Sequence, residues 1–523
     1  MADMEKTAET VAIPSPASLD ITSGSIRKRN KLVSLLKGRV TDPNEYGKEL
    51  FEQALQYDEA QLERDAVKVR RKIDFLILPL MCGTYMMSFL DKQTLNYSNT
   101  YGLQADTNMK GDDYSWVASA LNFGWLLAAY PWNFALQRYP IGRLIGCMLF
   151  IWGIVCMLQA AVFNFSGFFA IRFFLGALEA CISPAFILLT SMFWTHKEQS
   201  LRASFWLACN GFSSIIGALL AYGSGHVTNL AIPNWKLIYI IVGCMTICWG
   251  FVILYLLPDG PHNAKQLNEY ERQVAVWRVS SNRIGLKHKE IKLYQIKEAC
   301  MDPKVYLILL MGAAVGILNG GVVNFTSALI KGFGFAPLQA SLMQTPGGAF
   351  EIIGCILFGY ISVCRKNMLG ITIILSCLPG LAGLIGILTI PESQRYALVG
   401  MAWMQNVLGS PIILNWTQPG LNIAGHTKRT ATIGMYFVFY CAGNIAGPHL
   451  FLSDEVPRYP TAIKGLIGAY CALIFFQVIY TTLCSLENKR RDKAGLHVDE
   501  KEEEREGFDD LTDWENKHFR YVV

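Results

Sequence analysis

A small number of charged side chains lie inside long apolar stretches of this 523-residue chain. Two of them, Arg172 and Glu179, are seven residues apart within one such stretch. Seven residues are two turns of an α-helix, so both side chains point the same way if the stretch is helical. Asp91 and Lys92 are neighbours in another apolar stretch. A basic group beside a carboxylate in apolar surroundings can bind an anion and carry a proton.

The rise of an α-helix places three of these groups at one depth. If the stretch that holds Arg172 begins near Gly167, then Arg172 lies roughly 8 Å and Glu179 roughly 18 Å from that end. Asp91 and Lys92 lie about 8–9 Å from the corresponding end of their own stretch. We therefore expect the Asp91–Lys92 pair to meet Arg172, with Glu179 deeper. The alternatives are a structural salt bridge between two helices, or side chains that snorkel to water.

Two further acids lie in or beside apolar stretches. Glu351 follows Pro346–Gly348 in the middle of a stretch. It is either a second titrating group or a carboxylate bonded to neighbouring helices. Asp74 lies at the beginning of the first stretch, beside Arg70 and Arg71, which favours a structural pairing.

Neutral polar and aromatic side chains in these stretches could contact a bound molecule. Each amide that we single out can bond to a ligand or join neighbouring helices instead. These amides are Asn210, Asn319, Asn324, Asn406 and Asn415. Trp125 could line a cavity, although a single aromatic ring in such a stretch usually packs between helices.

The composition identifies the surroundings of these groups as a membrane. Hydrophobic residues make up 52% of the chain, charged residues make up only 17%, and the mean hydropathy is +0.29. The charges gather in Met1–Lys72, in Pro258–Lys304 and after Leu486. A water-soluble chain of this length spreads its charges throughout. The pattern indicates an all-α polytopic membrane protein and excludes a disordered, fibrous or ordinary soluble protein.

Twelve apolar segments are each long enough to cross a bilayer as a helix. They are residues 73–97, 114–135, 144–163, 167–190, 201–224, 236–257, 305–330, 338–361, 369–389, 396–417, 430–451 and 464–484. We expect a cytosolic N-terminal region (1–72), an N-terminal six-helix bundle (73–257), a cytosolic linker (258–304), a C-terminal six-helix bundle (305–484) and a solvated cytosolic tail (485–523). Two bundles joined in this way enclose a substrate path.

Lys and Arg residues indicate the orientation of these spans. The richer of the two alternating sets of loops contains Arg138, Arg143, Lys428 and Arg429, and by the positive-inside rule this set faces the cytosol. Both termini then lie in the cytosol. The net charge of +5 reflects the same loop bias and does not indicate nucleic-acid binding.

Other kinds of site find no support in the sequence. The 14 cysteines are scattered singly through apolar segments, which argues against a disulfide framework or a zinc site. The chain contains no Walker-type Gly-rich Lys loop, no His-Glu-x-x-His and no Gly-x-Ser-x-Gly. We expect no enzyme activity, no catalytic residues, no metal and no cofactor.

Several motifs together resemble those of the major facilitator superfamily, and the resemblance covers residues 72–485. More closely, the sequence resembles the anion:cation symporters and, among them, the fungal allantoate-permease-like branch. The motifs that carry the resemblance are Phe89–Lys92, Arg172–Ala180, Met192–Arg202, Gly285–Lys289 and Ala299–Lys304. The fold that it implies has twelve transmembrane helices in two six-helix bundles.

The resemblance also implies proton-driven uptake of a small organic anion by alternating access. It assigns proton coupling to Asp91 and Glu179, and substrate binding to Lys92 and Arg172. The further pocket residues that it suggests are Asn210 and Trp125. Lys92 replaces the Arg of many relatives, and a lysine lacks the fork that binds a carboxylate through two hydrogen bonds. Glu351, Asn319, Asn324 and Asn415 are additional candidates from the apolar stretches.

Two alternatives stay open beside this prediction. One is a facilitator that works without protons, and the other is a nutrient sensor that binds a ligand on the same scaffold but moves none. For the transporter we expect a carboxylate, ureido acid or vitamin as substrate. The small anion and protons are then its partners, and the chain is a monomer in the lipid bilayer of the plasma membrane.

Overall fold

The computed structural model describes residues 50–227, 231–280, 292–364, 367–494 and 511–523, and every structural statement below refers to these residues. Their regular secondary structure is entirely helical. Most of the predicted N-terminal region and part of the predicted linker lie outside the described residues.

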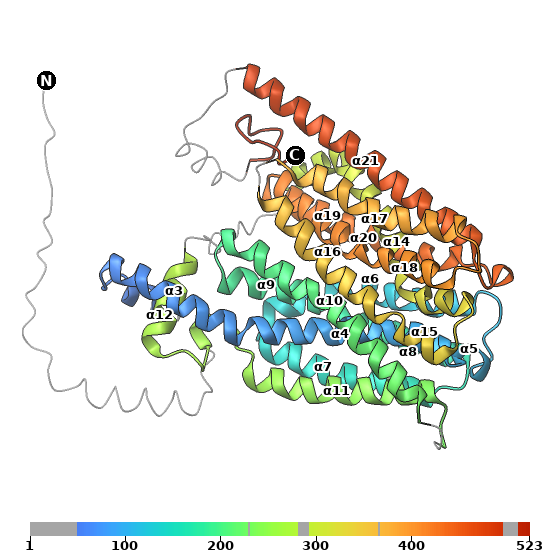
Figure 1. Ribbon diagram of the computed structural model, residues 1–523. Coiled ribbons are helices and arrows are strands. Elements are labelled where there is room, and N and C mark those ends of the chain that lie inside the picture. Colours follow the sequence, from blue (N-terminus) through green and yellow to red (C-terminus); the bar gives the residue numbers. More distant parts are fainter. Residues whose placement is uncertain (1–49, 228–230, 281–291, 365–366, 495–510) are drawn as a thin grey trace, which may run out of the picture.

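The first six predicted spans form one bundle, coloured blue to green in Figure 1. Its first span is α4 (Leu78–Thr100), which continues α3 (Glu59–Leu76) with one residue between them. The other five spans are α6 (Asp113–Arg138), α7 (Ile141–Leu158), α8 with α9 (Phe165–Glu179 and Ile182–Phe193), α10 (His196–Gly225) and α11 (Asn234–Leu256). The short helix α5 (Leu103–Asp106) joins the first two spans.

The last six predicted spans form the second bundle, coloured yellow to red in Figure 1. They are α14 (Pro303–Gly332), α15 with α16 (Pro337–Leu342 and Thr345–Cys364), α17 (Leu369–Thr389), α18 with α19 (Arg395–Gln405 and Gly409–Asn422), α20 (His426–Ala446) and α21 (Pro460–Lys493). Between the bundles, α12 (Glu269–Ser280) packs against α3, and α13 (Leu293–Met301) packs against α20. The prediction of twelve helices in two six-helix bundles is confirmed.

Nine of the described helical stretches are long and apolar enough to cross a membrane by length and composition alone. The other three spans are α6, α10 and α20. Each of these helices turns amide side chains towards the space between the bundles, for example Asn122, Asn210 and Asn444.

Three spans are interrupted, and each interruption coincides with a proline. The prolines are Pro184, Pro346 and Pro411. A proline has no N–H and so cannot bond to the carbonyl oxygen four residues earlier. Those carbonyls belong to positions 180, 342 and 407, and the α-helix is broken at 180–181, 343–344 and 406–408. The missing N–H accounts for these breaks, but Pro131, Pro379 and Pro419 lie within continuous helices, so a proline alone does not predict a break.

Glycines let α6 and α8 approach each other closely. A Cβ atom at Gly124 would lie 1.9 Å from the carbonyl oxygen of Phe173, and one at Gly176 would lie 1.9 Å from that of Leu121. No larger residue fits at either position without moving a backbone. This contact holds α8, which carries Arg172 and Glu179, against α6.

Hydrogen bonds join the two bundles at their outer ends. In the predicted orientation, α4 starts and α21 ends at the cytosolic side, and the outer ends are the opposite ones. The amide of Asn96 donates to Gln344 at 3.2 Å and accepts from the backbone N–H of Ser327 at 2.9 Å. Lys331 donates to the carbonyl oxygen of Thr100 at 3.3 Å. Among the described residues, every hydrogen bond between the bundles lies from the middle of the helices outward. The outer ends are therefore closed against each other.

Residues 511–523 fold back onto the cytosolic end of the C-terminal bundle. Asn422 and Val522 exchange two hydrogen bonds, at 2.9 and 2.7 Å. Arg491 donates to the carbonyl oxygens of Asp513, Asn516 and Phe519. The prediction of a solvated tail is wrong for this segment, because its partners are brought close only by the packing of α19 and α21.

A buried charge cluster anchors this segment. Lys428 is 0% exposed, and its Nζ lies 2.8 Å from Glu298, 2.8 Å from Asp302 and 2.6 Å from Asp513. Lys304 adds a second contact to Asp513, at 2.6 Å. The cluster thus joins the linker helix α13, the start of α14, the start of α20 and the C-terminal segment.

We expect Asp513→Asn to loosen the docked segment at neutral pH. Burial alone would raise the pKa of Asp513, but the charges of Lys304 and Lys428 outweigh it and hold this pKa below its usual range. Because the folded-state pKa is lowered, the stabilisation is complete above the unfolded value of about 3.9 and is lost as pH falls through the folded value. Removing one partner of a buried ion pair costs about 3–5 kcal/mol.

Hydrogen exchange of residues 511–523 in the purified full chain measures this effect. Asp492→Asn is the matched control, since Asp492 pairs with Arg520 at the surface, where such a pair contributes about 0–1 kcal/mol. Protection should fall strongly in Asp513→Asn and hardly at all in the control. Equal protection in the two variants would contradict the anchoring role of the cluster.

Candidate functional site

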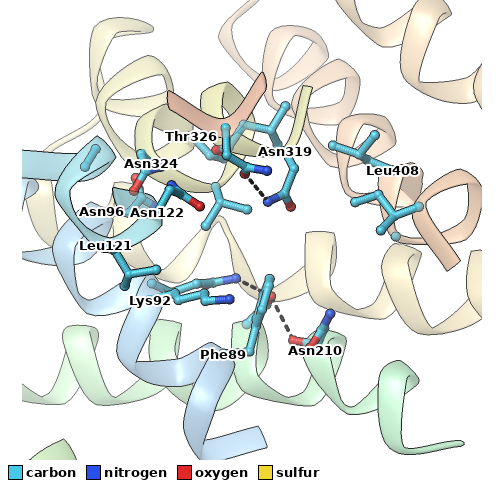
Figure 2. A pocket seen from close by; sticks show the side chains of 18 of the residues that line it. Phe89, Lys92, Asn96, Leu121, Asn122, Asn210, Asn319, Asn324, Thr326 and Leu408 are labelled. Carbon is cyan, nitrogen blue, oxygen red and sulfur yellow. Dashed lines mark hydrogen bonds between the residues drawn. The ribbon is translucent and has the colours of Figure 1, made fainter. Parts of the chain in front are cut away.

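A cavity lies between the two bundles, with an empty volume of about 1460 Å³ that includes its opening to solvent. Its walls come mainly from α4, α6, α8 and α10 on one side and from α14, α16, α19 and α20 on the other. Carboxamides from both bundles line it: Gln93, Asn96, Asn122, Asn210, Asn319, Asn324, Gln344, Gln405, Asn406 and Asn444. Figure 2 shows Lys92 and Asn319 approaching the same space from opposite bundles.

An ion pair between α4 and α8 provides the charged part of the cavity wall. Lys92 Nζ lies 2.5 Å from Glu179 Oε1, which also accepts a hydrogen bond from Ser88 Oγ at 3.0 Å. Glu179 Oε2 has no hydrogen-bond partner among the described residues. The side chain of Lys92 is 33% exposed and that of Glu179 only 6%. The ammonium group can therefore reach a molecule in the cavity without leaving its carboxylate.

Arg172 lines the same cavity from α8 but is almost fully buried. Its Nη2 donates to the hydroxyl of Tyr239 at 3.4 Å, and its Nε has no partner among the described residues. Arg172 and Glu179, two turns apart, both face the cavity. The positive charge of Arg172 contributes to the potential of the cavity from behind its surface.

Asp91 is not among the cavity-lining residues. Its two carboxylate oxygens accept hydrogen bonds from Trp152 Nε1 at 2.7 Å and Cys156 Sγ at 3.0 Å, both on α7. Asp91 therefore points towards α7, whereas the long side chain of Lys92 reaches the cavity. Its proton-coupling role stays a prediction, and the acids that line the cavity are Glu179 and Glu351.

The expected contact of Lys92 with Arg172 is wrong, whereas Asp91 does interact electrostatically with Arg172. Lys92 pairs with Glu179 instead, because its long side chain reaches inward from α4 to the end of α8. The break at residues 180–181 leaves Glu179 as the last residue of α8, beside the cavity. Helical rise alone could not reveal this pairing, since it ignores the length and direction of the side chains.

The candidate amides separate into cavity residues and packing residues. Asn319 and Asn324 line the cavity, and Asn319 also donates to Asn444 at 2.7 Å. Asn210 lines it too, and its side-chain oxygen has no partner among the described residues. Asn415 is fully buried away from the cavity and accepts a 2.7 Å hydrogen bond from Tyr436.

The remaining candidates also have defined positions. Trp125 lines the cavity and lies 5.5 Å from Phe437 of the other bundle, measured between ring centroids. Glu351 lines the cavity from α16. Asp74 pairs with Arg202 at 2.8 Å and accepts a hydrogen bond from Trp194, which is the structural pairing expected, although with other partners than Arg70 and Arg71.

Sequence reasoning missed several cavity residues, among them Gln93, Asn96, Asn122 and Gln344. One signal could have found the first two: Gln93 and Asn96 are three residues apart in α4, one helical turn, and so share a face. Gln344 lies in the break before Pro346, where irregular backbone within a membrane protein usually lines a cavity.

The sequence profile of the Major Facilitator Superfamily matches residues 81–448. An uncharacterized transporter of Schizosaccharomyces pombe is 37% identical over 472 residues, which cover 89% of this chain and 91% of that protein. The allantoate permease of Saccharomyces cerevisiae is 34% identical, over 87% of this chain and 86% of that protein. A thiamine pathway transporter of the same yeast is 29% identical, over 87% and 86%.

Solved structures show the same fold. A bacterial homologue of the human lysosomal transporter Spinster, in an inward-facing and unoccupied conformation, superposes with a TM-score of 0.56. The alignment covers 79% of this chain and 96% of that one at 13% identity. At this identity the likeness concerns the arrangement of the helices alone.

We expect Lys92→Met to destabilise the protein and the double variant Lys92→Met/Glu179→Met to recover most of the loss. The single substitution leaves a buried carboxylate without its countercharge, at a cost of about 2 kcal/mol or more, whereas apolar replacement of both partners is often neutral. Thermal unfolding of the detergent-solubilised protein measures both.

Lys68→Met is the matched control, because Lys68 pairs with Asp65 at the surface and is 81% exposed. Its unfolding temperature should stay close to that of the unmodified protein. A double variant less stable than Lys92→Met alone would contradict the compensating role of the ion pair.

Proposed function

The chain belongs to the Major Facilitator Superfamily, and on this basis we propose that it is a proton-coupled symporter of a small organic anion. That it is a multi-pass membrane transporter and not an enzyme follows from its family and relatives. Proton coupling, the anionic substrate and the direction of uptake are the proposed part. The observation that carries them is the ion pair between Lys92 and Glu179 in the cavity wall.

The ion pair supplies a physical route from proton binding to anion binding. When Glu179 takes up a proton, its attraction for Lys92 is lost, and the ammonium group becomes free to bind a carboxylate. When the proton leaves, Glu179 competes for Lys92 again and weakens the hold on the substrate. Substrate and proton therefore favour the same state of the cavity, as symport requires.

Alternating access then carries both ligands across the membrane. The outer ends are closed by hydrogen bonds in the present conformation. Rocking of the two bundles about the cavity would break these bonds and admit substrate from the other side. Arg172 adds a second positive charge behind the cavity surface, which favours an anion over a cation.

The carboxamides that line the cavity favour a polar substrate. Carboxamides from both bundles offer donors and acceptors around Lys92, which suits a carboxylate that carries further polar groups, such as a ureido acid. One relative is named an allantoate permease and another a thiamine pathway transporter, which agrees with small polar substrates. We therefore propose ureido acids first, then other carboxylates and vitamins.

Uptake into liposomes that contain the purified protein tests the proposal. Candidate anions, allantoate among them, are offered with an inward proton gradient or with none. We expect accumulation above equilibrium only with the gradient. Glu179→Gln should abolish accumulation but keep exchange, and Lys92→Met should raise the substrate KM by about tenfold or more, as the loss of a charge-assisted hydrogen bond implies.

The alternatives predict other results in the same assay. A facilitator would equilibrate the anion whether or not a proton gradient is present. A nutrient sensor would bind the anion but show no flux. Asp65→Asn, a surface change at the cytosolic end, is the control variant and should transport normally.

We also propose that the chain is a monomer in the plasma membrane with both termini in the cytosol, as the distribution of Lys and Arg indicates. Epitope tags at the two termini should react with antibody only after cells are permeabilised. Surface staining of either tag in intact cells would contradict this orientation.

A further inference from the structure

Glu351 lies in the wall of the cavity with no countercharge. It belongs to α16 of the C-terminal bundle and is 6% exposed. Its only hydrogen bond among the described residues joins Oε2 to Ser214 Oγ, at 3.4 Å. No described ion pair includes Glu351. The cation in the same cavity wall, Lys92, is paired with Glu179.

The elements packed around Glu351 bring no cation to it. On α10, Ser214 and Asn210 face it, and Gly409, which follows η3 (Asn406–Leu408), packs against Oε1. The titratable groups that interact with it are the hydroxyls of Tyr85 and Tyr97 and the thiol of Cys355, all of which are neutral at physiological pH. Neither α17 nor α18 contributes a described ion pair to it.

These surroundings suit the uncharged form of the carboxyl group. An ionised carboxylate in a membrane interior is costly unless a charge or several hydrogen bonds compensate it, and Glu351 has one weak hydrogen bond. A protonated carboxyl can donate to Ser214 Oγ, and Ser214 can then donate to the carbonyl oxygen of Asn210 at 3.1 Å. Gln93 Nε2 donates a further hydrogen bond to Ser214 Oγ, at 2.7 Å.

The contact between Glu351 and Ser214 joins the two bundles. Helices α10 and α16 touch closely here, because a Cβ atom at Gly348 would lie 2.5 Å from the carbonyl oxygen of Gly211. Of the hydrogen bonds between the bundles, this one lies deepest, next to the cavity and beneath those at the outer ends. Opening the outer ends must therefore separate Glu351 from Ser214 and admit water to it.

We propose that Glu351 carries a second proton and that its protonation allows the outer ends of the bundles to close over the cavity. This inference rests on the proposed function, and it adds a group in the C-terminal bundle to the ion pair in the N-terminal one. The closed state accepts only the neutral carboxyl, whereas the open state hydrates it and lets it ionise. Protons from outside thus favour closure around the substrate.

Hydrogen exchange of the outer segments around Thr100 and Lys331, at a series of pH values and without substrate, tests this link. The purified full chain in lipid nanodiscs should show strong protection in acid and weaker protection as pH increases, where protection is the exchange rate divided into the intrinsic amide rate at the same pH. One proton allows the opening equilibrium to change at most about tenfold for each pH unit. Glu351→Gln, which is always neutral, should keep these segments protected over the whole series.

Two further variants keep the test decisive even if Glu351→Gln folds poorly. Ser214→Ala removes the partner of the neutral carboxyl, so the outer segments should begin to open at lower pH. Glu392→Gln is the control, because Glu392 is an exposed acid at the outer end of the same bundle, and its profile should match the unmodified protein.

Loss of the pH response in Glu351→Gln, with a shift in Ser214→Ala, supports the proposal. An unchanged pH response in both variants overturns it. The readout involves neither substrate nor flux. The test of Glu351 therefore remains valid even if Glu179 proves not to couple protons to transport. A role of Glu351 that is only structural would change thermal stability but would leave the pH response in place.

Discussion

A charge in the interior of a membrane protein must be compensated, and this constraint organises the cavity. Lys92 and Glu179 satisfy it by pairing across α4 and α8, and Asp91 satisfies it through hydrogen bonds from α7. Among the described residues, Glu351 has no ion pair and only one long hydrogen bond, to Ser214. The three acids therefore differ in how readily each can hold a negative charge, although all belong to transmembrane helices.

Backbone chemistry brings the polar groups to the cavity. The prolines that interrupt three spans leave Glu179, Gln344 and Asn406 at or beside breaks in the helix. Free carbonyl groups there need polar surroundings, and a cavity lined by carboxamides and open to solvent provides them. The glycine contact between α6 and α8 sets the distance between the helices that carry the site. Local sequence and site geometry are thus directly connected.

The two bundles bond to each other on the outer side, whereas at the cytosolic end each bundle bonds only to its own segments among the described residues. Between them, hydrogen bonds run from the cavity to the outer ends. At the cytosolic end, each bundle bonds to its own neighbouring segments, such as α12 on one side and residues 511–523 on the other. A transporter that rocks two bundles needs this separation, since contacts within a bundle must survive the motion while contacts between them must break.

The sequence by itself determined the membrane class, the twelve spans and the division into two bundles. These follow from local composition, which acts within a few residues. It also identified Arg172, Glu179, Lys92 and Glu351 as unusual, because charges are rare in apolar spans. Only the tertiary structure decided that Lys92 meets Glu179, that Asp91 faces α7, and that Asp513 binds Lys428. Such pairings depend on the rotation and approach of helices distant in sequence, and no local pattern encodes those quantities.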